Sequence, residues 1–312
     1  MTLLYLLLLL PIFWILGKSA NLTTRAIVDI AKIIGLSDLT IGFVILGLAT
    51  STPELLVGIN SALGGTPELS FGNLVGANIV LLSFVVGLSA ILNNGIHLRD
   101  RIERRTIHAS SLLVLIPLVL ALDGIVSRLD GVVMVAVYAM YLTAVVLKRH
   151  TLSIARPFAR HDVRSTTLWI WFGTGVIGLL VGSKLVVMLA IELSVGWNIA
   201  PIIIGFLLLS FGTNLPEIFI TIKNRNSEHN HIAFGNVIGS AVVNTLILGI
   251  VAIIHPIVVS DLRFLLTGMA FLVAVAITLN IFLKTKDTLS RTEGVVLLMI
   301  YIFFIVTQGM NR

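Results

Sequence analysis

The 312-residue chain is 57% hydrophobic and only 12% charged, with a mean hydropathy of +1.06, which excludes a soluble globular protein of this length and indicates an integral membrane protein. It contains no cysteine, so disulfides, thiolate metal sites and thiol nucleophiles are excluded. The net charge of +6 does not indicate nucleic-acid binding, because the basic residues lie in short breaks between apolar segments rather than in one patch.

Ten apolar segments of about 17 to 25 residues follow one another along the chain, each long enough to span a bilayer as a helix. The first is expected to be a span rather than a cleaved signal peptide, because no basic residue precedes its apolar run and it has no clear small-residue cleavage site. The sequence therefore predicts an all-α integral membrane protein with ten transmembrane helices, at residues 2–17 (or 2–33), 39–62, 69–92, 106–122, 131–147, 167–192, 199–222, 232–255, 262–283 and 293–310.

Lysine and arginine are distributed unevenly between the breaks. Seventeen of the 21 lie in breaks that would face one side of the membrane, three lie on the other side, and Lys184 falls within a span. By the positive-inside rule the basic side is cytoplasmic, so we expect both termini to face the extracytoplasmic side of a plasma or inner membrane.

The second half of the chain repeats the first at a constant offset of 163 residues. The segment 46–58, which contains Glu54, recurs as 209–221, which contains Glu217, and the sequence FGN at 71–73 recurs at 234–236. Each half contains five predicted helices, and because five is odd the second half enters the membrane from the opposite side. We therefore predict two inverted-topology five-helix repeats, at 1–147 and 167–312, joined by a cytoplasmic linker at 148–166. Such inverted repeats are typical of transporters.

Each copy of the repeated segment places a glutamate directly after a proline inside an apolar helix. A charged group at the bilayer centre costs about 2.5–3.5 kcal/mol, so Glu54 and Glu217 need a compensating partner. The preceding proline removes a backbone donor, which frees carbonyl oxygens around Thr50 and Thr213 to face a cavity. If the two halves face each other, two carboxylates and several carbonyl oxygens converge near the midplane, a ligand set that suits calcium. The alternative is a packed helix pair whose acids are neutral and hydrogen-bonded to neighbours.

Two carboxylates balance one divalent ion, whereas without an ion they repel each other, so the emptied site needs sodium ions or protons. This requirement favours exchange over a pore. Asn78 and Asn244 are equally consistent with ion ligands and with amides that hold helices together, and the glycine-asparagine pairs at 72–73 and 235–236 are interpreted as packing residues. Weaker candidates for metal ligands are Ser51, Asn214, Ser210 and Ser240.

The paired motifs resemble those of the calcium:cation antiporter superfamily, particularly its prokaryotic sodium/calcium exchangers. The resemblance lies in ATSTPELLVG with FGNLVGANIV in the first half and in FGTNLPEIFIT with FGNVIGSAVVN in the second, and it extends more weakly over all ten helices. It implies that Glu54 and Glu217 are calcium ligands, that Thr50 and Thr213 contribute carbonyl oxygens and hydroxyls, and that the first and sixth helices slide past the other eight. The hydroxyl positions that it assigns to sodium sites are Ser51 and Ser240.

The chain departs from the family's usual pattern around the sodium positions. The usual GTSLPE reads ATSTPE in the first half and GTNLPE in the second, where Asn214 replaces the common serine. The serine expected after the GNLVG glycine is Ala77, and the asparagine or aspartate expected four residues later is Leu81, although Asn244 keeps that position in the second half. Asn78, one helical turn before Leu81, is a candidate replacement. These changes leave the two-glutamate site in place and leave open whether sodium or protons are the counter-ion.

The sequence therefore predicts a secondary antiporter that exchanges calcium for sodium by alternating access at a mid-membrane two-glutamate site. A calcium/proton exchanger is the alternative within this class, and a cation channel is the alternative from another class. An enzyme is not expected, since cysteine, an HExxH motif and paired intramembrane aspartates are missing from the sequence. No cofactor is expected; the partners are the transported calcium, the sodium ions or protons, and the lipid bilayer, and we expect the chain to function as a monomer.

Overall fold

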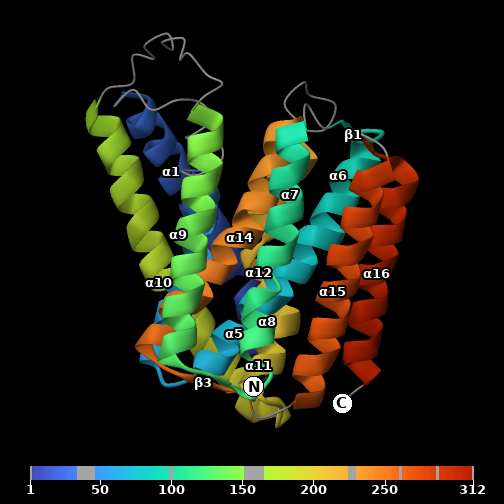
Figure 1. Cartoon of the computed structure of the whole chain (residues 1–312). Helices are drawn as coiled ribbons and strands as arrows, with labels where there is room; N and C mark the ends of the chain where they lie inside the picture. The colour runs from blue at the N-terminus through green and yellow to red at the C-terminus, as the bar shows by residue number, and fades with distance from the viewer. Residues whose placement is uncertain are drawn as a thin grey trace.

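The protein is an all-α bundle whose long helices run between the same two ends of the molecule (Figure 1). The computed structural model describes residues 2–33, 46–97, 101–150, 165–223, 230–259, 262–285 and 288–310. Within these ranges eight helices are long and apolar enough to cross a membrane. The predicted class of a helical membrane protein is therefore confirmed. The start of the first helix and the end of the last lie at the same end of the bundle (Figure 1).

The helices are divided between the two halves of the chain. The first half contains α1 (Thr2–Ile33), α3 (Leu46–Thr50), α4 (Thr52–Leu63), α5 (Pro67–Ile79), the π-helical η2 (Val80–Val85), α6 (Val86–Leu92), α7 (Arg101–Leu113), α8 (Ile116–Leu120) and α9 (Arg128–His150). The second half contains α10 (Ser165–Trp197), α11 (Pro201–Ile204), the π-helical η3 (Gly205–Leu209), α12 (Ser210–Thr213), α13 (Leu215–Lys223), α14 (Asn230–Ile254), α15 (Leu262–Thr285) and α16 (Arg291–Met310).

Each of the ten predicted segments contains helix, but three of them are interrupted: 39–62, 106–122 and 199–222, which is broken at Asn214 between α12 and α13. In the segment 39–62, residues 34–45 lie outside the described part, and the helix that follows is interrupted at Ser51. The segment 106–122 divides into α7 and α8, because Pro117 cannot donate to the carbonyl four residues earlier. The first segment follows the longer alternative, since α1 continues to Ile33. Most of the predicted linker 148–166 also lies outside the described residues, between the end of α9 and the start of α10.

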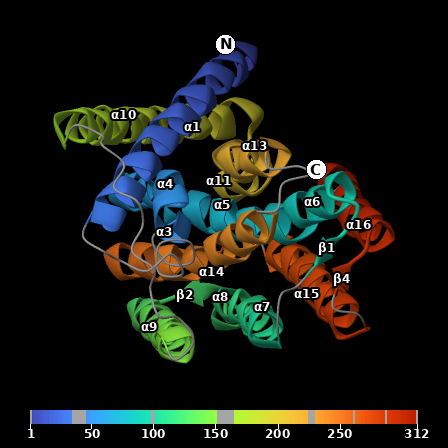
Figure 2. The same cartoon turned by 90° about the horizontal axis from the view of Figure 1, so that it is seen from above.

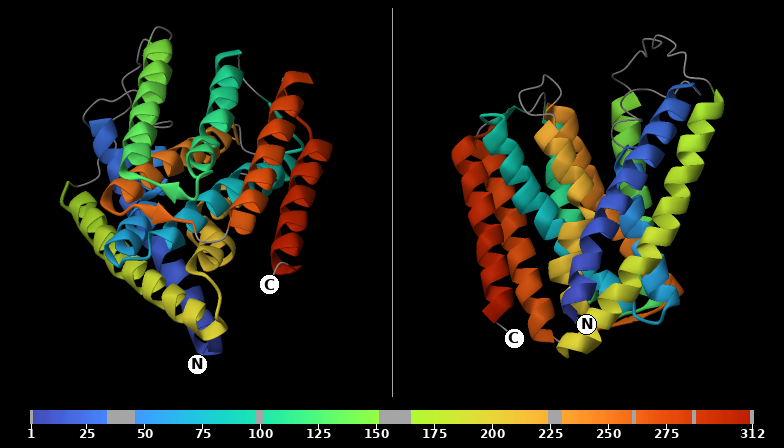
Figure 3. Two further views of the ribbon diagram at one scale, coloured as in Figure 1. Left: turned by 60° about the horizontal axis from the view of Figure 1, so that its bottom comes forward. Right: turned by 180° about the vertical axis from the view of Figure 1, so that it is seen from behind.

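Helices α1 and α10 pack along each other at one side of the bundle (Figures 2 and 3). Small residues make this contact close: a Cβ added to Gly175 would lie 2.3 Å from the Oγ1 of Thr23, and one added to Gly178 would lie 2.1 Å from the Oγ of Ser19. The polar stretch that follows the apolar start of α1 is therefore buried as helix against α10. The apolar residues of the pair belong to a second hydrophobic cluster, separate from the main core. This second cluster includes Leu9, Phe13, Leu16, Leu179, Val186 and Leu193.

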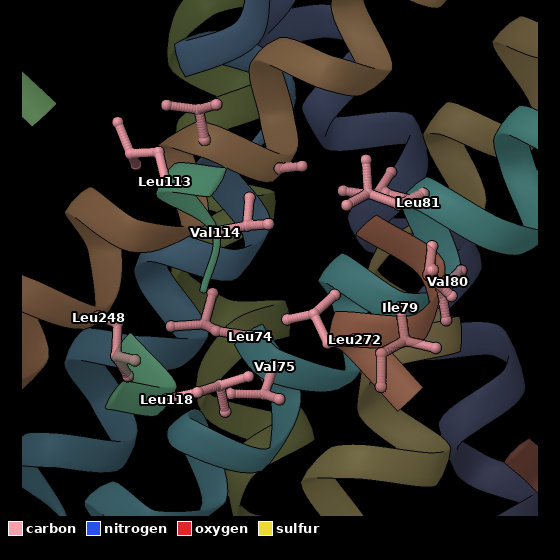
Figure 4. Close-up of a cluster of buried hydrophobic side chains, with 14 of the residues drawn as sticks. Leu74, Val75, Ile79, Val80, Leu81, Leu113, Val114, Leu118, Leu248 and Leu272 are labelled. Atoms are coloured by element: carbon pink, nitrogen blue, oxygen red, sulfur yellow. The ribbon is translucent and has the colours of Figure 1, made fainter. Parts of the chain in front are cut away.

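The main hydrophobic core lies among α5, η2, α7, α8, α14 and α15 (Figure 4). The labelled members of this core are Leu74, Val75, Ile79, Val80, Leu81, Leu113, Val114, Leu118, Leu248 and Leu272. The outer faces of the bundle are also apolar, as a lipid-facing surface requires. For example, Leu129 on α9 is 77% exposed and Met299 on α16 is 59% exposed.

Contacts between the two halves come in reciprocal pairs. Helix α9 packs on α14, where a Cβ on Gly131 would lie 2.7 Å from the carbonyl oxygen of Gly249. Helix α16 packs in the same way on α6, where a Cβ on Gly294 would lie 2.8 Å from the carbonyl oxygen of Gly87. Two short antiparallel strand pairs also join one half to the other. Strand β1 (Ile96–His97) pairs with β4 (Thr288–Leu289), and β2 (Ile125–Val126) pairs with β3 (Ile257–Val258).

The starts of α9 and α16 are fixed by matching capping interactions. The backbone nitrogen of Ser127 donates to Asp130 Oδ2 at 2.8 Å, and that of Ser290 donates to Glu293 Oε2 at 2.7 Å. In both cases an acidic side chain three residues into the helix reaches back to the capping serine. The last helix of each half therefore begins with the same capping motif, a serine followed three residues later by an acidic residue.

Candidate cation site

The two helices that carry the repeated Thr-x-x-Pro-Glu segment are both interrupted one residue after the threonine. Ser51 separates α3 from α4 with φ −83° and ψ 10°, and Asn214 separates α12 from α13 with φ −86° and ψ 5°. The proline that follows each break, Pro53 or Pro216, is tolerated in the first turn of a new helix but not inside a continuous one. The sequence therefore dictates a broken helix at the same place in both halves.

The two breaks differ in how they use the carbonyl oxygen that the proline leaves without a donor. In the first half the hydroxyl of Thr52 donates to the carbonyl of Ala49 at 2.8 Å. In the second half the residue at the same place is Leu215, which has no hydroxyl. The expectation that both freed carbonyls turn toward a cavity is thus modified for the first half, where a local side chain occupies one of them.

Glu54 on α4 and Glu217 on α13 are both only 1% exposed. Their carboxyl groups lie near each other, Glu54 beside Thr213 and Glu217 beside Thr50, so that each acid faces the threonine of the other half. None of the four carboxylate oxygens has a hydrogen-bond partner among the described residues. Where burial is described, these are the only buried side chains with a formal charge.

The threonines of the two breaks reach the asparagines of the opposite half. The Oγ1 of Thr50 lies 3.4 Å from Asn236 Oδ1 on α14, and the Oγ1 of Thr213 lies 3.4 Å from Asn73 Oδ1 on α5. The two contacts are equivalent at the 163-residue offset. Each threonine that faces a carboxylate therefore also lies beside an amide oxygen of the opposite half.

A close helix crossing holds α5 in this position. A Cβ on Gly72 would lie 2.0 Å from the carbonyl oxygen of Ile202, and one on Gly205 would lie 2.1 Å from that of Leu69. Contacts this short are accessible only to glycine, so α5 can approach α11 and η3 backbone to backbone. The interpretation of Gly72 as a packing residue is confirmed, and its neighbour Asn73 is placed beside the site by that packing.

Two further pairs of candidate residues meet across the two halves. The Nδ2 of Asn244 donates to the Oδ1 of Asn78 at 2.8 Å, which joins α14 to α5. The Oδ1 of Asn244 is buried and has no partner among the described residues, so one oxygen of this amide pair is available to a ligand. The Oγ of Ser240 lies 3.0 Å from the Oγ1 of Thr50.

The remaining predicted site residues, Ser51, Ser210 and Asn214, are buried at or near the two breaks. The hydroxyl of Ser210 donates to the carbonyl of Phe206 at 2.5 Å, and the Nδ2 of Asn214 donates to the carbonyl of Ser210 at 2.7 Å. Ser51 is 2% exposed, and its hydroxyl does not cap α4.

Sequence reasoning assigned Asn73 and Asn236 to packing, whereas the structure brings their side-chain oxygens to the site threonines. Asn73 and Asn236 are 163 residues apart, as Glu54 and Glu217 are, and this shared offset could have identified them as site residues. The complete group consists of two carboxylates with hydroxyl and amide oxygens, and no set of three or more histidine, cysteine or acidic residues forms a metal centre in the described ranges. Such all-oxygen surroundings suit a hard cation.

The chain is similar to several known membrane proteins along most of its length. The family described as "Sodium/calcium exchanger protein" matches residues 3–147 and 167–310. The membrane protein MJ0091 of Methanocaldococcus jannaschii is 30% identical over 285 residues, which cover 90% of each chain. The sodium/calcium exchanger MaX1 of Methanosarcina acetivorans is 26% identical over 97% of each chain. Among solved structures, the sodium-calcium exchanger NCX_Mj soaked with 10 mM Na⁺ and 10 mM Sr²⁺ has a TM-score of 0.69 and 27% identity, with 98% of this chain and 99% of that chain covered.

Proposed function

Because the chain belongs to the sodium/calcium exchanger protein family, which matches it over residues 3–147 and 167–310, we propose that it is a secondary antiporter that exchanges calcium for sodium. The observation that carries this proposal is the pair of buried carboxylates, one from each half, whose four oxygens have no hydrogen-bond partner among the described residues. Two unpaired buried carboxylates are costly, and a divalent cation between Glu54 and Glu217 removes that cost.

Calcium fits the surroundings of the two glutamates as well as their charge. It takes six to eight oxygen ligands, carboxylates and carbonyls among them. We assign Glu54 and Glu217 as the carboxylate ligands and Thr50 and Thr213 as sources of carbonyl and hydroxyl oxygens. The neutral residues that we propose as further ligands of calcium or sodium are Ser51, Asn78, Ser210, Asn214, Ser240 and Asn244.

We further propose that the two halves are inverted-topology repeats of five helices each, residues 1–147 and 167–312, joined by the linker 148–166. The reciprocal contacts of α9 with α14 and of α16 with α6 support this arrangement, as do the two cross-half strand pairs. The placement of both chain ends at one end of the bundle supports an even number of spans (Figure 1). The excess of basic residues in the opposite breaks orients these ends toward the extracytoplasmic side of the cell's inner or plasma membrane.

Alternating access is proposed to involve movement of α1 and α10 against the other helices. The apolar side chains of the pair belong to a second cluster, which also contains Val57 of α4 and Ile204 of α11. Helix α1 also contacts the second break. A Cβ added to Gly212, the residue directly before Thr213, would lie 2.3 Å from the ring of Phe13 on α1. A shift of α1 would therefore change the packing around the second break. We propose that the chain functions as a monomer, because one chain supplies both carboxylates of the site.

Calcium uptake into proteoliposomes tests this function. Vesicles loaded with sodium and diluted into sodium-free buffer should accumulate calcium with saturable kinetics, and vesicles with equal sodium on both sides should not. Uptake driven only by a pH gradient would contradict sodium coupling and favour calcium/proton exchange. Flux that needs no counter-gradient and saturates poorly would favour a channel.

A further inference from the structure

The exposed surface of α1 changes character near the middle of the helix. Up to Ile15, all of its described exposed side chains are apolar. From residue 17 to residue 30 only three side chains are exposed, and all three are polar: Lys18, Asn21 and Arg25. A change from apolar to basic residues along one membrane helix is typical of the boundary between acyl chains and lipid headgroups.

These polar residues share one face of α1 with a tryptophan. Trp14, Lys18, Asn21 and Arg25 follow one another at spacings of four, three and four residues, which places them in a row along the helix. The Nζ of Lys18 lies 5.5 Å from the centre of the Trp14 ring, within the range of a cation–π contact. We call this row the α1 basic stripe.

The α1 basic stripe has little negative charge to balance it. Asp29 is the only acidic residue of α1, and it is half-buried one turn beyond Arg25. No acidic residue of α1 stands within two turns of Lys18. The group that complements the stripe is therefore an anion.

Helix α13 places apolar surface beside the stripe. It runs alongside α1 in the same direction, because a Cβ on Gly212 would meet the ring of Phe13, and a Cβ on Gly17 would lie 3.6 Å from the Cγ of Pro216. Three residues beyond Pro216, Phe219 lies on the same face of α13 and is 62% exposed. An exposed aromatic ring thus flanks α1 at the level of the stripe.

Helix α10 is also apolar at this level. A Cβ on Gly175 would lie 2.3 Å from the Oγ1 of Thr23, and Ile177, two residues further along α10, is 63% exposed. The basic stripe thus lies where both neighbouring helices expose apolar side chains. A soluble anion or an acidic peptide complements only the charge of this surface, whereas a phospholipid supplies an anionic phosphate together with acyl chains.

We propose that the α1 basic stripe binds the headgroup of an anionic phospholipid in the leaflet at the C-terminal end of α1. The lipid phosphate accepts hydrogen bonds from Lys18, Asn21 and Arg25, and the acyl chains lie against the apolar side chains of α10 and α13. In the orientation proposed above this is the cytoplasmic leaflet. The binding does not depend on ion exchange, so its test requires no transport.

Quenching of Trp14 fluorescence by brominated phospholipids measures this binding in proteoliposomes. The other three tryptophans are replaced by phenylalanine, so that the signal reports only on lipids next to the stripe. Brominated phosphatidylglycerol should be preferred to brominated phosphatidylcholine by about 30-fold, since each of the two cations contributes about fivefold. Equal quenching by the two lipids at all ratios would overturn the proposal.

Three charge-removing substitutions assign the preference to the stripe. Lys18→Gln and Arg25→Gln should each lower it about fivefold, and the double variant should abolish it. Lys184→Gln is the matched control, because Lys184 is an exposed lysine inside α10 with no basic residue within two turns on its helix. This control removes the same charge as Lys18→Gln and should keep the full preference. A preference that the double variant retains, or that Lys184→Gln lowers as much as Lys18→Gln does, would show that the stripe is not the site.

Discussion

Replacing Glu54 or Glu217 by glutamine should abolish calcium binding without lowering the stability of the calcium-free protein. Glutamine keeps the shape of glutamate and removes its charge. Neither carboxylate has a hydrogen-bond partner among the described residues, so each substitution removes a buried, unpaired charge and relieves the repulsion between the two acids. The calcium-free variants should therefore unfold at the same temperature as the wild type or at a higher one.

The loss of calcium affinity can be estimated from Coulomb's law. Two unit charges 4 Å apart interact by about 4 kcal/mol at an effective dielectric constant of about 20. A divalent ion interacts more strongly than a unit charge, so losing one of the two carboxylates should weaken calcium binding by at least about a thousandfold. Calcium at about 100 times the wild-type Kd stabilises the folded wild type by about 2.7 kcal/mol, but it should stabilise the variants by less than about 0.1 kcal/mol.

Thermal unfolding of the purified protein in sodium-free detergent buffer, with and without calcium, measures both effects. The matched control is Glu68→Gln, because Glu68 also follows a Thr-Pro pair but lies half-buried in the first turn of α5. This control should keep the calcium-induced stabilisation. A calcium-free Glu54→Gln protein that is strongly destabilised, yet still stabilised by calcium, would show that Glu54 is a structural residue and would refute the two-carboxylate site.

Three further substitutions test the surroundings of the site. Gly72→Ala puts a Cβ 2.0 Å from the carbonyl oxygen of Ile202, so it should cost about 1–3 kcal/mol of stability and reduce calcium uptake. Gly173→Ala is the control: its Cβ meets no described atom within 4 Å, so this substitution should be neutral or stabilising. In thermal unfolding, Asn78→Leu should cost about 1–3 kcal/mol because it leaves the Asn244 amide unpaired, and adding Asn244→Leu should recover part of that loss; purely additive costs would contradict the pairing. Asp130→Ala removes the cap of α9 and should cost about 1 kcal/mol without slowing calcium uptake, so a transport defect would show that this cap does more than start the helix.

Hydrophobicity and the internal repeat were sufficient to predict the helices, because in a membrane each backbone hydrogen bond must be satisfied within a segment. Tertiary contacts decided what the sequence left open. The polar stretch around Ser19 and Thr23 left two ends possible for the first helix, residue 17 or residue 33; these residues are buried against glycines of α10, which lets α1 continue to Ile33. The π-helical η2 and η3 left no signal that periodicity could detect, since they are short irregularities inside otherwise helical spans.

The candidate site was predictable in its charges and less so in its neutral partners. The two glutamates stand out because carboxylates are rare in apolar helices and these occur at matching positions. The contacts of Thr50 with Asn236 and of Thr213 with Asn73 depend on how the two halves face each other, which a single sequence does not specify. The hydrogen bond from Thr52 to the Ala49 carbonyl depends on a threonine that stands where the second half has a leucine, and its geometry required the folded structure.

Calcium binding to the purified protein in sodium-free buffer, measured by isothermal titration calorimetry, tests the two-glutamate site most directly. We predict one calcium ion per chain, displacement of calcium by added sodium, and no measurable binding by Glu54→Gln or Glu217→Gln. Calcium binding that both variants retain, or that sodium does not displace, would contradict the assignment of Glu54 and Glu217 as the shared site of the exchanged ions.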